Sequence, residues 1–324
     1  MGGISIEEID GARLAFSGDA VWLMNLLLGV IMYSIALDLR MSDFQRLARA
    51  PKPVLTGLAS QFILLPAVTF LLILAVAPPA SMALGMILVA ACPGGNVSNF
   101  ITHRAGGNAA LSVSMTACAT AAAIFMTPIN IAFWGGLYGP TREILRETFV
   151  DPAQVAATVT VILILPLLAG MLTRARAPQL AGRLRGPMQW LSMGLFMVFV
   201  IAIIAGNADL FAQFFTAVAA LVIAHNALAF AAGYGIATAA RLSDYDRRAV
   251  TIETGIQNSG LGLALIFAFF DGLGGMAITA GFWGVWHLIA GMTLAAILGR
   301  RPAAGGAGAD DHAAGAARDP KRSQ

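Results

Sequence analysis

Charged residues are scarce in this chain of 324 residues, because Asp, Glu, Lys and Arg make up only 11% of it. Soluble globular domains carry about 25%. Apolar runs recur instead, each about 20 residues long, which is the length that a helix needs to cross a bilayer. The short alternating strands of a transmembrane β-barrel are also missing. The composition therefore predicts an all-α polytopic membrane protein in a lipid bilayer, with no nucleic-acid partner.

Cysteine and catalytic motifs are equally sparse. Cys92 and Cys118 lie in apolar stretches without CxxC or metal-ligand spacing, and we interpret them as small buried residues. No glycine-rich phosphate loop, zinc-protease motif or triad pattern has a supporting context. The sequence thus predicts neither an enzyme nor a cofactor. Residues 1–19 lack the basic start and apolar core of a cleavable signal peptide, so the first apolar helix is expected to direct insertion.

Nine segments have the length and apolar character of membrane spans. They lie near residues 20–39, 54–77, 81–103, 109–138, 153–173, 188–206, 211–240, 247–270 and 275–299. With nine crossings, all of the 20 Lys and Arg residues except Arg13, Arg142 and Arg146 fall on one side. Basic loop residues collect on the cytoplasmic side of membrane proteins. We therefore expect a multi-pass protein of the cell (inner) membrane, with its N-terminus outside and its C-terminus in the cytoplasm.

The same pattern divides the chain into three parts. A polar extracytoplasmic arm is expected over residues 1–18, a transmembrane domain over 19–300, and a disordered cytoplasmic tail over 301–324. Prolines beside the apolar segments, among them Pro178 and Pro187, are expected in the connections.

Two segments share an unusual interruption. Cys92-Pro-Gly-Gly-Asn-Val-Ser-Asn-Phe100 and Glu253-Thr-Gly-Ile-Gln-Asn-Ser-Gly260 each place glycine, Asn and Ser inside an apolar helix. Matching broken helices are typical of transporters that are built from inverted repeats. The pattern favours a first repeat over about 20–138 with four helices and a second over about 153–299 with five, so that the first repeat lacks its leading helix.

Glu253 is the most informative residue, because it lies deep in an apolar segment. A charged side chain at the bilayer centre costs about 3 kcal/mol or more on insertion scales, which marks it as a candidate functional residue. No Arg or Lys lies deep in any segment to pair with it. One carboxylate among hydroxyl, amide and carbonyl oxygens suits a monovalent hard cation such as sodium. The N-termini of half-helices favour an anionic substrate nearby.

Other polar residues in the apolar segments allow two interpretations. Ser112 and Thr116 are four residues apart on one helix face, and Gln257 is four residues after Glu253. Gln61 and His287 also lie within spans. Taken alone, Ser112, Thr116, Gln61 and His287 are better explained by a hydrogen bond within or between helices. For Gln257 that explanation is the less favoured one. We interpret the neighbouring pair His225 and Asn226 as structural.

At these motifs the sequence resembles the bile acid:sodium symporter family. The resemblance rests on Pro93-Gly-Gly-Asn-Val-Ser-Asn99, Gly107-Asn-Ala-Ala-Leu-Ser-Val-Ser-Met-Thr116, Glu253-Thr-Gly-Ile-Gln-Asn-Ser-Gly260 and Leu37-Asp-Leu-Arg-Met-Ser-Asp-Phe44, and it covers residues 20–300. It implies a panel domain and a core domain, in which two broken helices cross. Family members bind two sodium ions behind that crossing.

The resemblance also implies roles for individual residues. The first sodium site would comprise Ser98, Asn99, Ser112, Thr116 and Glu253. The second would comprise Gln61, Glu253 and Gln257 with backbone carbonyls near Thr254 and Ile256. Asn96, Asn258 and His287 are expected to face the substrate. Many bacterial relatives have ten helices, and some carry a polar Asn where this chain has Leu288, so the substrate is not fixed by the resemblance.

The resulting expectation is a sodium-coupled symporter that imports an organic anion by alternating access. A bile acid-like steroid, a keto acid and a pantothenate-like carboxylate are the substrate classes considered. Two alternatives stay open: a proton-coupled or arsenite-type carrier, which Cys92 beside the broken helix motivates, and an anion sensor that does not transport. The short tail argues against the sensor.

Overall fold

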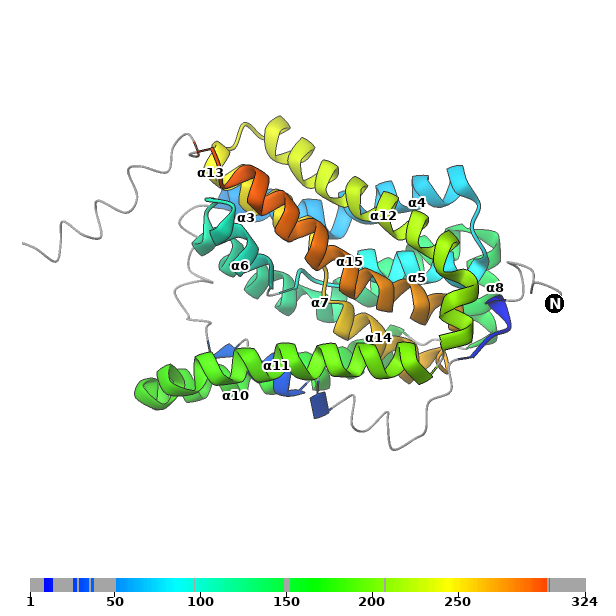
Figure 1. Cartoon of the computed structure of the whole chain (residues 1–324), viewed down its shortest axis with the longest axis horizontal. Coiled ribbons are helices and arrows are strands. Elements are labelled where there is room, and N and C mark those ends of the chain that lie inside the picture. Colours follow the sequence, from blue (N-terminus) through cyan, green and yellow to red (C-terminus); the bar gives the residue numbers. More distant parts are fainter. Residues whose placement is uncertain are drawn as a thin grey trace, which may run out of the picture.

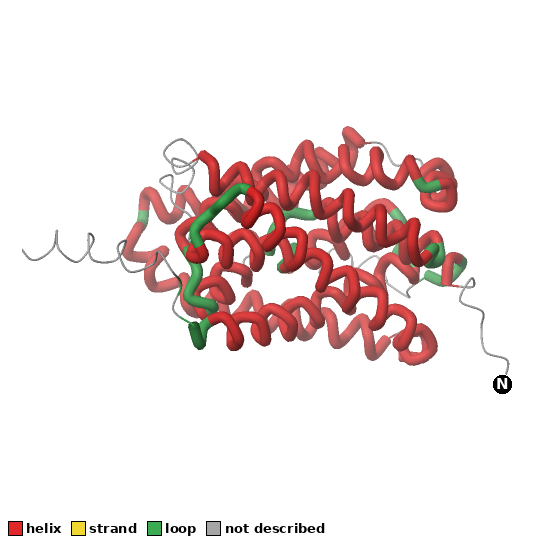
Figure 2. The backbone as a smooth tube through the Cα atoms, turned by 90° about the horizontal axis from the view of Figure 1, so that it is seen from above, coloured by secondary structure: helices red, strands yellow, loops and turns green. Residues whose placement is uncertain are grey.

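The computed structural model describes residues 9–13, 26–27, 29–34, 36–37, 51–95, 97–148, 152–206, 208–301 and 303. Over this part of the chain the structure is almost entirely helical and contains no strand (Figure 2). Short helical pieces lie between residues 26 and 36. The remaining elements are α3 (Pro51–Ala59), η2 (Ser60–Leu64), α4 (Leu65–Val76), α5 (Ala80–Ala91), α6 (Val97–Arg104), α7 (Ala109–Leu137), α8 (Gly139–Glu147), α9 (Pro152–Val159), η3 (Thr160–Ile164), α10 (Leu165–Arg176), α11 (Pro178–Gly206), α12 (Ala208–Ala239), α13 (Asp244–Gly255), α14 (Ser259–Phe269) and α15 (Gly274–Leu298).

Within the described residues, four helical stretches are long and apolar enough to cross a membrane. They are Pro51–Val76, Ala109–Leu137, Ala212–Ala239 and Gly274–Leu298, and two shorter apolar helices, α5 and α14, accompany them. The predicted membrane class is therefore supported by length and composition. The count of nine crossings stays a prediction.

One helix begins earlier than the sequence pattern indicated. We expected a connection up to Pro187, but α11 starts at Pro178 and contains Pro187. Polar residues such as Arg183 and Arg185 resemble a loop in a hydropathy profile. Proline is tolerated in the first turn of a helix, so Pro178 begins α11 and does not end a loop. The helix then continues past Pro187 into the apolar stretch.

The two apolar segments with glycine-rich interruptions are each broken into two helices. The first break separates α5, which ends at Ala91, from α6, which begins at Val97, and the second separates α13 from α14 at residues 256–258. Gly94 and Gln257 face each other in an isolated antiparallel bridge. The Gly95 N–H donates to the Ile256 carbonyl at 2.8 Å, and the Asn258 N–H donates to the Pro93 carbonyl at 3.0 Å. Each break thus satisfies backbone groups of the other, which a bilayer interior demands.

The core of the molecule surrounds these breaks. Residues Ser81–Ala91 of α5 and Ser259–Phe267 of α14 are all buried, as expected of helices that are apolar on every side and enclosed by other helices. α15 packs along α5 and α14. At one edge of the molecule, α10 and α11 lie side by side (Figure 1). Here large apolar side chains are exposed, including Trp190 at 74% and Val198 at 64%.

Two helical stretches contain a π-helical turn followed by proline. In η2 the Leu65 N–H donates to the Ser60 carbonyl, five residues back, and Pro66 follows. η3 precedes Pro166 in the same way. Proline has no N–H to donate and disturbs the helical ladder on its N-terminal side, and π-turns are often found at functional sites. The turn in η2 carries Gln61, one of the predicted site residues.

Residues 9–13 pack against the starts of two helices. The carboxylate of Asp10 accepts from the Ala80 N–H at 3.1 Å and from the Ser81 N–H at 2.7 Å. Asp10 thereby caps α5, where a negative charge also complements the helix dipole. The Ala12 carbonyl accepts from the Gly274 N–H at the start of α15. This described part of the predicted arm lies at the same end of the molecule as α8 (Figure 1). The rest of the arm and almost all of the predicted tail lie outside the described residues.

Candidate functional site

Glu253 lies in the last turn of α13, directly before the second break, and is 2% exposed. Its carboxylate accepts three hydroxyl hydrogen bonds. Ser98 and Ser112 donate to Oε2 at 2.6 and 2.8 Å, and Thr116 donates to Oε1 at 2.6 Å. Ser98 comes from α6, and the other two hydroxyls come from α7. Charge-assisted bonds of this kind are about twice as strong as neutral ones, so they offset part of the desolvation of the acid.

These four residues, which we call the carboxylate cluster (Ser98, Ser112, Thr116 and Glu253), are held by local backbone geometry. Ser112 and Thr116 are one turn apart on α7, so their hydroxyls lie on the same face. Ser98 follows the first break. Thr116 also donates to Asn99 Oδ1 at 3.3 Å, which connects Asn99 to the cluster through Thr116. All five residues of the predicted first sodium site therefore lie together.

A glycine makes room for the carboxylate. A Cβ at Gly94 would lie 2.4 Å from Glu253 Oε1, and a Cβ at Gly95 would lie 2.9 Å from the Gln257 carbonyl oxygen. The backbone of the first break thus approaches the second break more closely than any side chain allows. The two glycines are needed for this contact.

The buried acid has no basic partner among the described residues. The nearest arginine in sequence is Arg248, which is 6% exposed. It donates to the carbonyls of Ala105 and Leu298 at 2.7 and 3.0 Å and pairs with Asp244 at 2.8 Å. The recorded ion pairs do not include Glu253. Arg248 is thus buried but engaged elsewhere, and the absence of a neutralising Arg or Lys stays a prediction.

A second polar group, which we call the amide cluster (Gln61, Gln257 and the carbonyls of Cys92 and Thr254), lies across the same break. Gln61 Nε2 donates to Gln257 Oε1 at 2.6 Å and to the Cys92 carbonyl at 2.8 Å. Gln257 Nε2 donates to the Thr254 carbonyl at 2.7 Å. Both glutamines are 1% exposed. Gln61, Gln257 and the Thr254 carbonyl of the predicted second sodium site are thus brought together. The Glu253 carboxylate bonds instead to the carboxylate cluster, and the Ile256 carbonyl accepts from Gly95.

Two further residues at the breaks were not selected from the sequence. Ser60 Oγ lies 2.8 Å from Thr254 Oγ1, next to Gln61 in η2. Asn226 Nδ2 donates at 2.8 Å to the Gly255 carbonyl, where α13 ends. We interpreted Asn226 only as structural, yet it satisfies a carbonyl that the break frees. For Ser60, the sequence signal was Pro66, because a proline disturbs the helix on its N-terminal side, where Ser60 lies.

The three residues expected to face the substrate lie in different surroundings. Asn96 lies outside the described residues. Asn258 caps α14, since its side chain accepts from the Leu261 N–H at 3.0 Å. His287 is 4% exposed on α15, and its Nδ1 atom has no hydrogen-bond partner. A buried ring nitrogen without a partner leaves a hydrogen-bonding valence for a ligand or water.

The chemistry of the two clusters is that of hard oxygen ligands. They offer one carboxylate, three hydroxyls, amide oxygens and freed backbone carbonyls, which suit an ion such as sodium. The described residues contain no group of three or more His, Cys, Asp or Glu side chains that could hold a transition metal. α6 and α14 both begin at the breaks, and their N-terminal N–H groups favour an anion there.

Comparison with known proteins agrees with this chemistry. The Sodium Bile acid symporter family model matches residues 25–214. Over 272 residues the chain is 31% identical to the "uncharacterized sodium-dependent transporter YocS" of Bacillus subtilis, covering 84% of this chain and 81% of that protein. It is 32% identical to the "probable sodium/metabolite cotransporter BASS2, chloroplastic" of Oryza sativa, over 74% of this chain but only 55% of that protein. It is 28% identical to the "sodium-dependent organic anion transporter" of Mus musculus, over 77% of this chain and 65% of that protein.

The family match spans more than half of the chain, and the alignment with the Bacillus protein spans most of both proteins. The family match includes the first broken helix and the hydroxyl residues Ser98, Ser112 and Thr116, while Glu253 lies beyond it. The chain therefore belongs to the sodium bile acid symporter family, a family of sodium-dependent membrane transporters.

Proposed function

We propose that this protein is a sodium-coupled importer of an organic anion that works by alternating access. The observation that carries the proposal is the carboxylate cluster: a buried acid with three hydroxyl partners and no ion pair among the described residues. A buried charge without a counter-ion is unfavourable. A sodium ion that enters beside Glu253 supplies the missing charge, and the hydroxyls supply further oxygen ligands.

Two sodium sites share Glu253 in this proposal. The first uses Ser98, Asn99, Ser112, Thr116 and Glu253, and the second uses Gln61, Glu253 and Gln257 with the Thr254 and Ile256 carbonyls. Hydrogen bonds join the side chains within each cluster, and Gly94 lies between the clusters, because it bridges Gln257 and lies close to the Glu253 carboxylate. Occupying either site would change the charge and the hydrogen bonding at the other. That physical link makes binding of the two ions cooperative.

The substrate in this proposal is an organic anion that lies beside the two breaks. The N-termini of α6 and α14 favour its negative charge. Asn96, Asn258 and His287 are the side chains proposed to contact it. A bile acid-like steroid, a keto acid and a pantothenate-like carboxylate are the classes to test. The name of the mouse relative, an organic anion transporter, agrees with this class.

The proposed arrangement in the membrane has nine crossings in the cell (inner) membrane, with the N-terminus outside. The two broken helices belong to inverted repeats of four and five helices. A core that holds the breaks would move against a panel that includes α10 and α11. The position of the α10–α11 pair at one edge of the molecule supports this division (Figure 1).

Uptake into proteoliposomes tests the proposal. The purified chain would be reconstituted, and accumulation of labelled taurocholate, pyruvate and pantothenate would be measured with an inward sodium gradient and with potassium on both sides. We expect at least one anion to accumulate only with the gradient, and a sodium ionophore to abolish it. Glu253→Gln should abolish this sodium-driven uptake, whereas Asp209→Asn, at an exposed acid on α12, is the matched control and should keep it. Equal uptake in sodium and potassium for every anion would overturn sodium coupling.

The alternatives have less support. An arsenite-type carrier would use the Cys92 thiol, but Cys92 is 0% exposed and packs in the apolar core. Unchanged arsenite resistance of cells that carry Cys92→Ala would remove this alternative. If the protein were a sensor that binds the anion without transporting it, the anion would raise its thermal stability. The anion would then not accumulate in proteoliposomes.

A further inference from the structure

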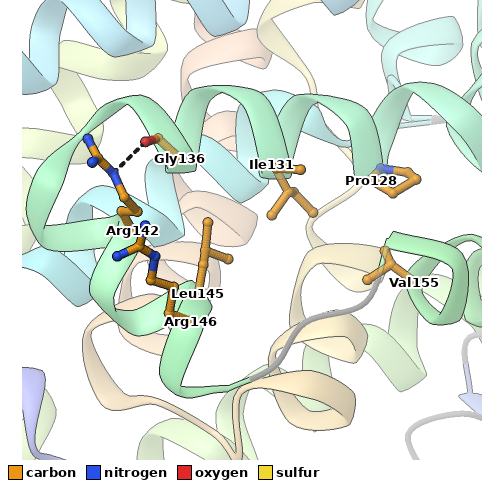
Figure 3. Close-up of a pocket in the computed structure, with 8 residues that line it drawn as sticks. Pro128, Ile131, Gly136, Arg142, Leu145, Arg146 and Val155 are labelled. Atoms are coloured by element: carbon orange, nitrogen blue, oxygen red, sulfur yellow. Dashed lines mark hydrogen bonds between the residues drawn. The ribbon is translucent and has the colours of Figure 1, made fainter.

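A separate cavity lies between α7, α8 and α9, away from both clusters. Its volume is about 190 Å³. The wall is apolar and is formed mainly by Pro128, Ile131, Leu145 and Val155, of which Ile131 and Val155 are at most 3% exposed. Arg142 and Arg146 lie at one end of the cavity, while Pro128 and Val155 lie at the other (Figure 3). An apolar space with cationic groups at one end has the character of a site for an anionic amphiphile.

The two arginines of the cavity lie on one helix. They are four residues apart on α8, so they share one face of the helix. Arg142 Nε donates to the Gly136 carbonyl at 2.8 Å. No ion pair is recorded for either arginine in the part of the chain that the structure describes. Glu143 and Glu147 are exposed on the same helix, as are the two arginines, and Glu143 lies three residues before Arg146. Among the described residues neither glutamate forms an ion pair with Arg142 or Arg146.

The position of the pair is also unusual for a membrane protein. In the proposed topology, Arg142 and Arg146 are two of three basic residues on the outer side, where Lys and Arg are normally depleted. Both contribute to the same cavity. α8 is the connection between α7 and α9, and these two helices also pack on each other. Concentrating cationic groups at one apolar cavity is explained by an anionic ligand, since planar guanidinium groups bind carboxylates with two parallel hydrogen bonds.

We propose that this cavity is a second, outer binding site for a short organic carboxylate. The carboxylate binds to Arg142 and Arg146, and the carbon chain contacts Ile131, Leu145 and Val155. The volume of about 190 Å³ is below the roughly 300–1,000 Å³ of pockets for drug-sized ligands, so the site selects a short chain and not a steroid. The assignment to the outer side rests on the proposed function and topology, whereas the binding chemistry does not.

Binding of labelled hexanoate to the purified full chain tests this site. The measurement is made in potassium chloride, because the outer site requires no sodium. We expect saturable binding that weakens as salt rises. Affinity should increase from acetate to butyrate to hexanoate by about fourfold for each methylene that becomes buried. Hexanamide, which has the same chain but no charge, should bind at least tenfold more weakly.

Variants of the arginines and of the glutamates of α8 provide the matched comparison. Arg142→Gln with Arg146→Gln should weaken hexanoate binding by about tenfold or more, because hydrogen bonds to charged groups are lost. Glu143→Gln with Glu147→Gln changes the same number of exposed charges on the same helix and should leave binding equal or tighter. Arg142 also donates a hydrogen bond to the Gly136 carbonyl, so its replacement changes the local structure as well as the charge. Arg146→Gln alone is therefore the second variant, and the thermal stability of each variant is measured.

Several outcomes would overturn the site. These are absence of saturable hexanoate binding, equal binding of hexanamide, or full binding by the arginine variants. A fourth is loss of hexanoate binding when phosphatidylglycerol is added to phosphatidylcholine nanodiscs, because the cavity would then be a binding site for an anionic lipid headgroup. Failure of the proposed transport function has a different signature. In that case proteoliposomes show no sodium-driven uptake, while hexanoate binding in potassium and its loss in Arg146→Gln persist.

Discussion

The carboxylate cluster and the amide cluster lie on the same break but satisfy their polar groups differently. In the carboxylate cluster, three hydroxyls donate to one acid that has no counter-ion among the described residues. In the amide cluster, Gln61 and Gln257 donate to each other and to backbone carbonyls. The first cluster carries a formal charge and the second is neutral.

This difference predicts different responses to a cation. A hydroxyl that donates to Glu253 needs only to rotate its proton to present an oxygen lone pair. A glutamine has its donor and acceptor at fixed positions on the amide. The carboxylate cluster should therefore provide most of the affinity. The amide cluster should provide selectivity and the coupling between ions. Four substitutions test this comparison, from the largest expected effect to the smallest.

Glu253→Gln should have the largest effect, because it removes the only charge in the two clusters and keeps the shape of the side chain. Two unit charges 4 Å apart attract by about 4 kcal/mol at an effective dielectric constant of 20. The apparent Kd for sodium should rise by about a hundredfold or more. Thermal stability in potassium should not fall, since a buried charge is removed. The stabilisation by sodium should disappear. Sodium-dependent stabilisation that survives in the variant would refute the central role of Glu253.

Gly94→Ala should displace the carboxylate cluster without replacing any of its side chains. The new Cβ would lie 2.4 Å from Glu253 Oε1, so the carboxylate must shift. Overpacking of this kind costs about 1–3 kcal/mol, and sodium-driven uptake should fall by about tenfold or more. Gly182→Ala in α11 is the control, because a Cβ there meets nothing within 4 Å. If both variants behaved alike, the close approach of the breaks would not matter for function.

Gln257→Ala should affect the amide cluster selectively. It removes the hydrogen bonds to Gln61 and to the Thr254 carbonyl, each worth about 1 kcal/mol. The sodium dependence of uptake should become less steep, with an apparent Kd about tenfold higher. Gln213→Ala, on the exposed side of α12, is the control. Adding Gln61→Ala should cost little more, because contacting residues are not additive. An additive double variant would contradict a shared ion site.

Ser112→Ala should have the smallest effect, because it removes one of three hydroxyls from Glu253. A single hydrogen bond of this kind is worth about 1–3 kcal/mol, so uptake should fall about fivefold at limiting sodium and recover when sodium is raised. Ser114 is on the same helix and is buried, but its hydroxyl donates to the Ala110 carbonyl. Ser114→Ala should therefore leave the sodium dependence unchanged. Equal effects of the two serines would show that helix α7, and not the cluster, is being perturbed.

The sequence carried strong signals for the two broken helices. Glycine, Asn and Ser inside long apolar runs identified both breaks, and the isolated acid identified Glu253. Gln61 and the pair Ser112 and Thr116 became candidates for ion ligation only through the family resemblance, because alone they are explained by ordinary helix hydrogen bonds.

Other features could not be predicted because they depend on tertiary contacts. The hydrogen bond from Asn226 to the Gly255 carbonyl requires α12 to lie against the end of α13. The π-turn at Ser60–Leu64 depends on how the helix accommodates Pro66. The early start of α11 was missed because a hydropathy profile cannot distinguish a polar helix from a polar loop. The arginine-lined cavity likewise needs α8 to fold back on α7.

The backbone bonds between the two breaks also have a consequence for how the protein is made. Ser98 and Glu253 are 155 residues apart, and the Gly95 and Pro93 backbone groups bond to Ile256 and Asn258. When the first broken helix leaves the ribosome, its partner has not yet been synthesised, and unpaired backbone groups are costly in a bilayer. The first break must stay near water or the insertion machinery until α13 and α14 arrive. Truncated chains that end before α13 are therefore expected to be substrates for membrane quality control.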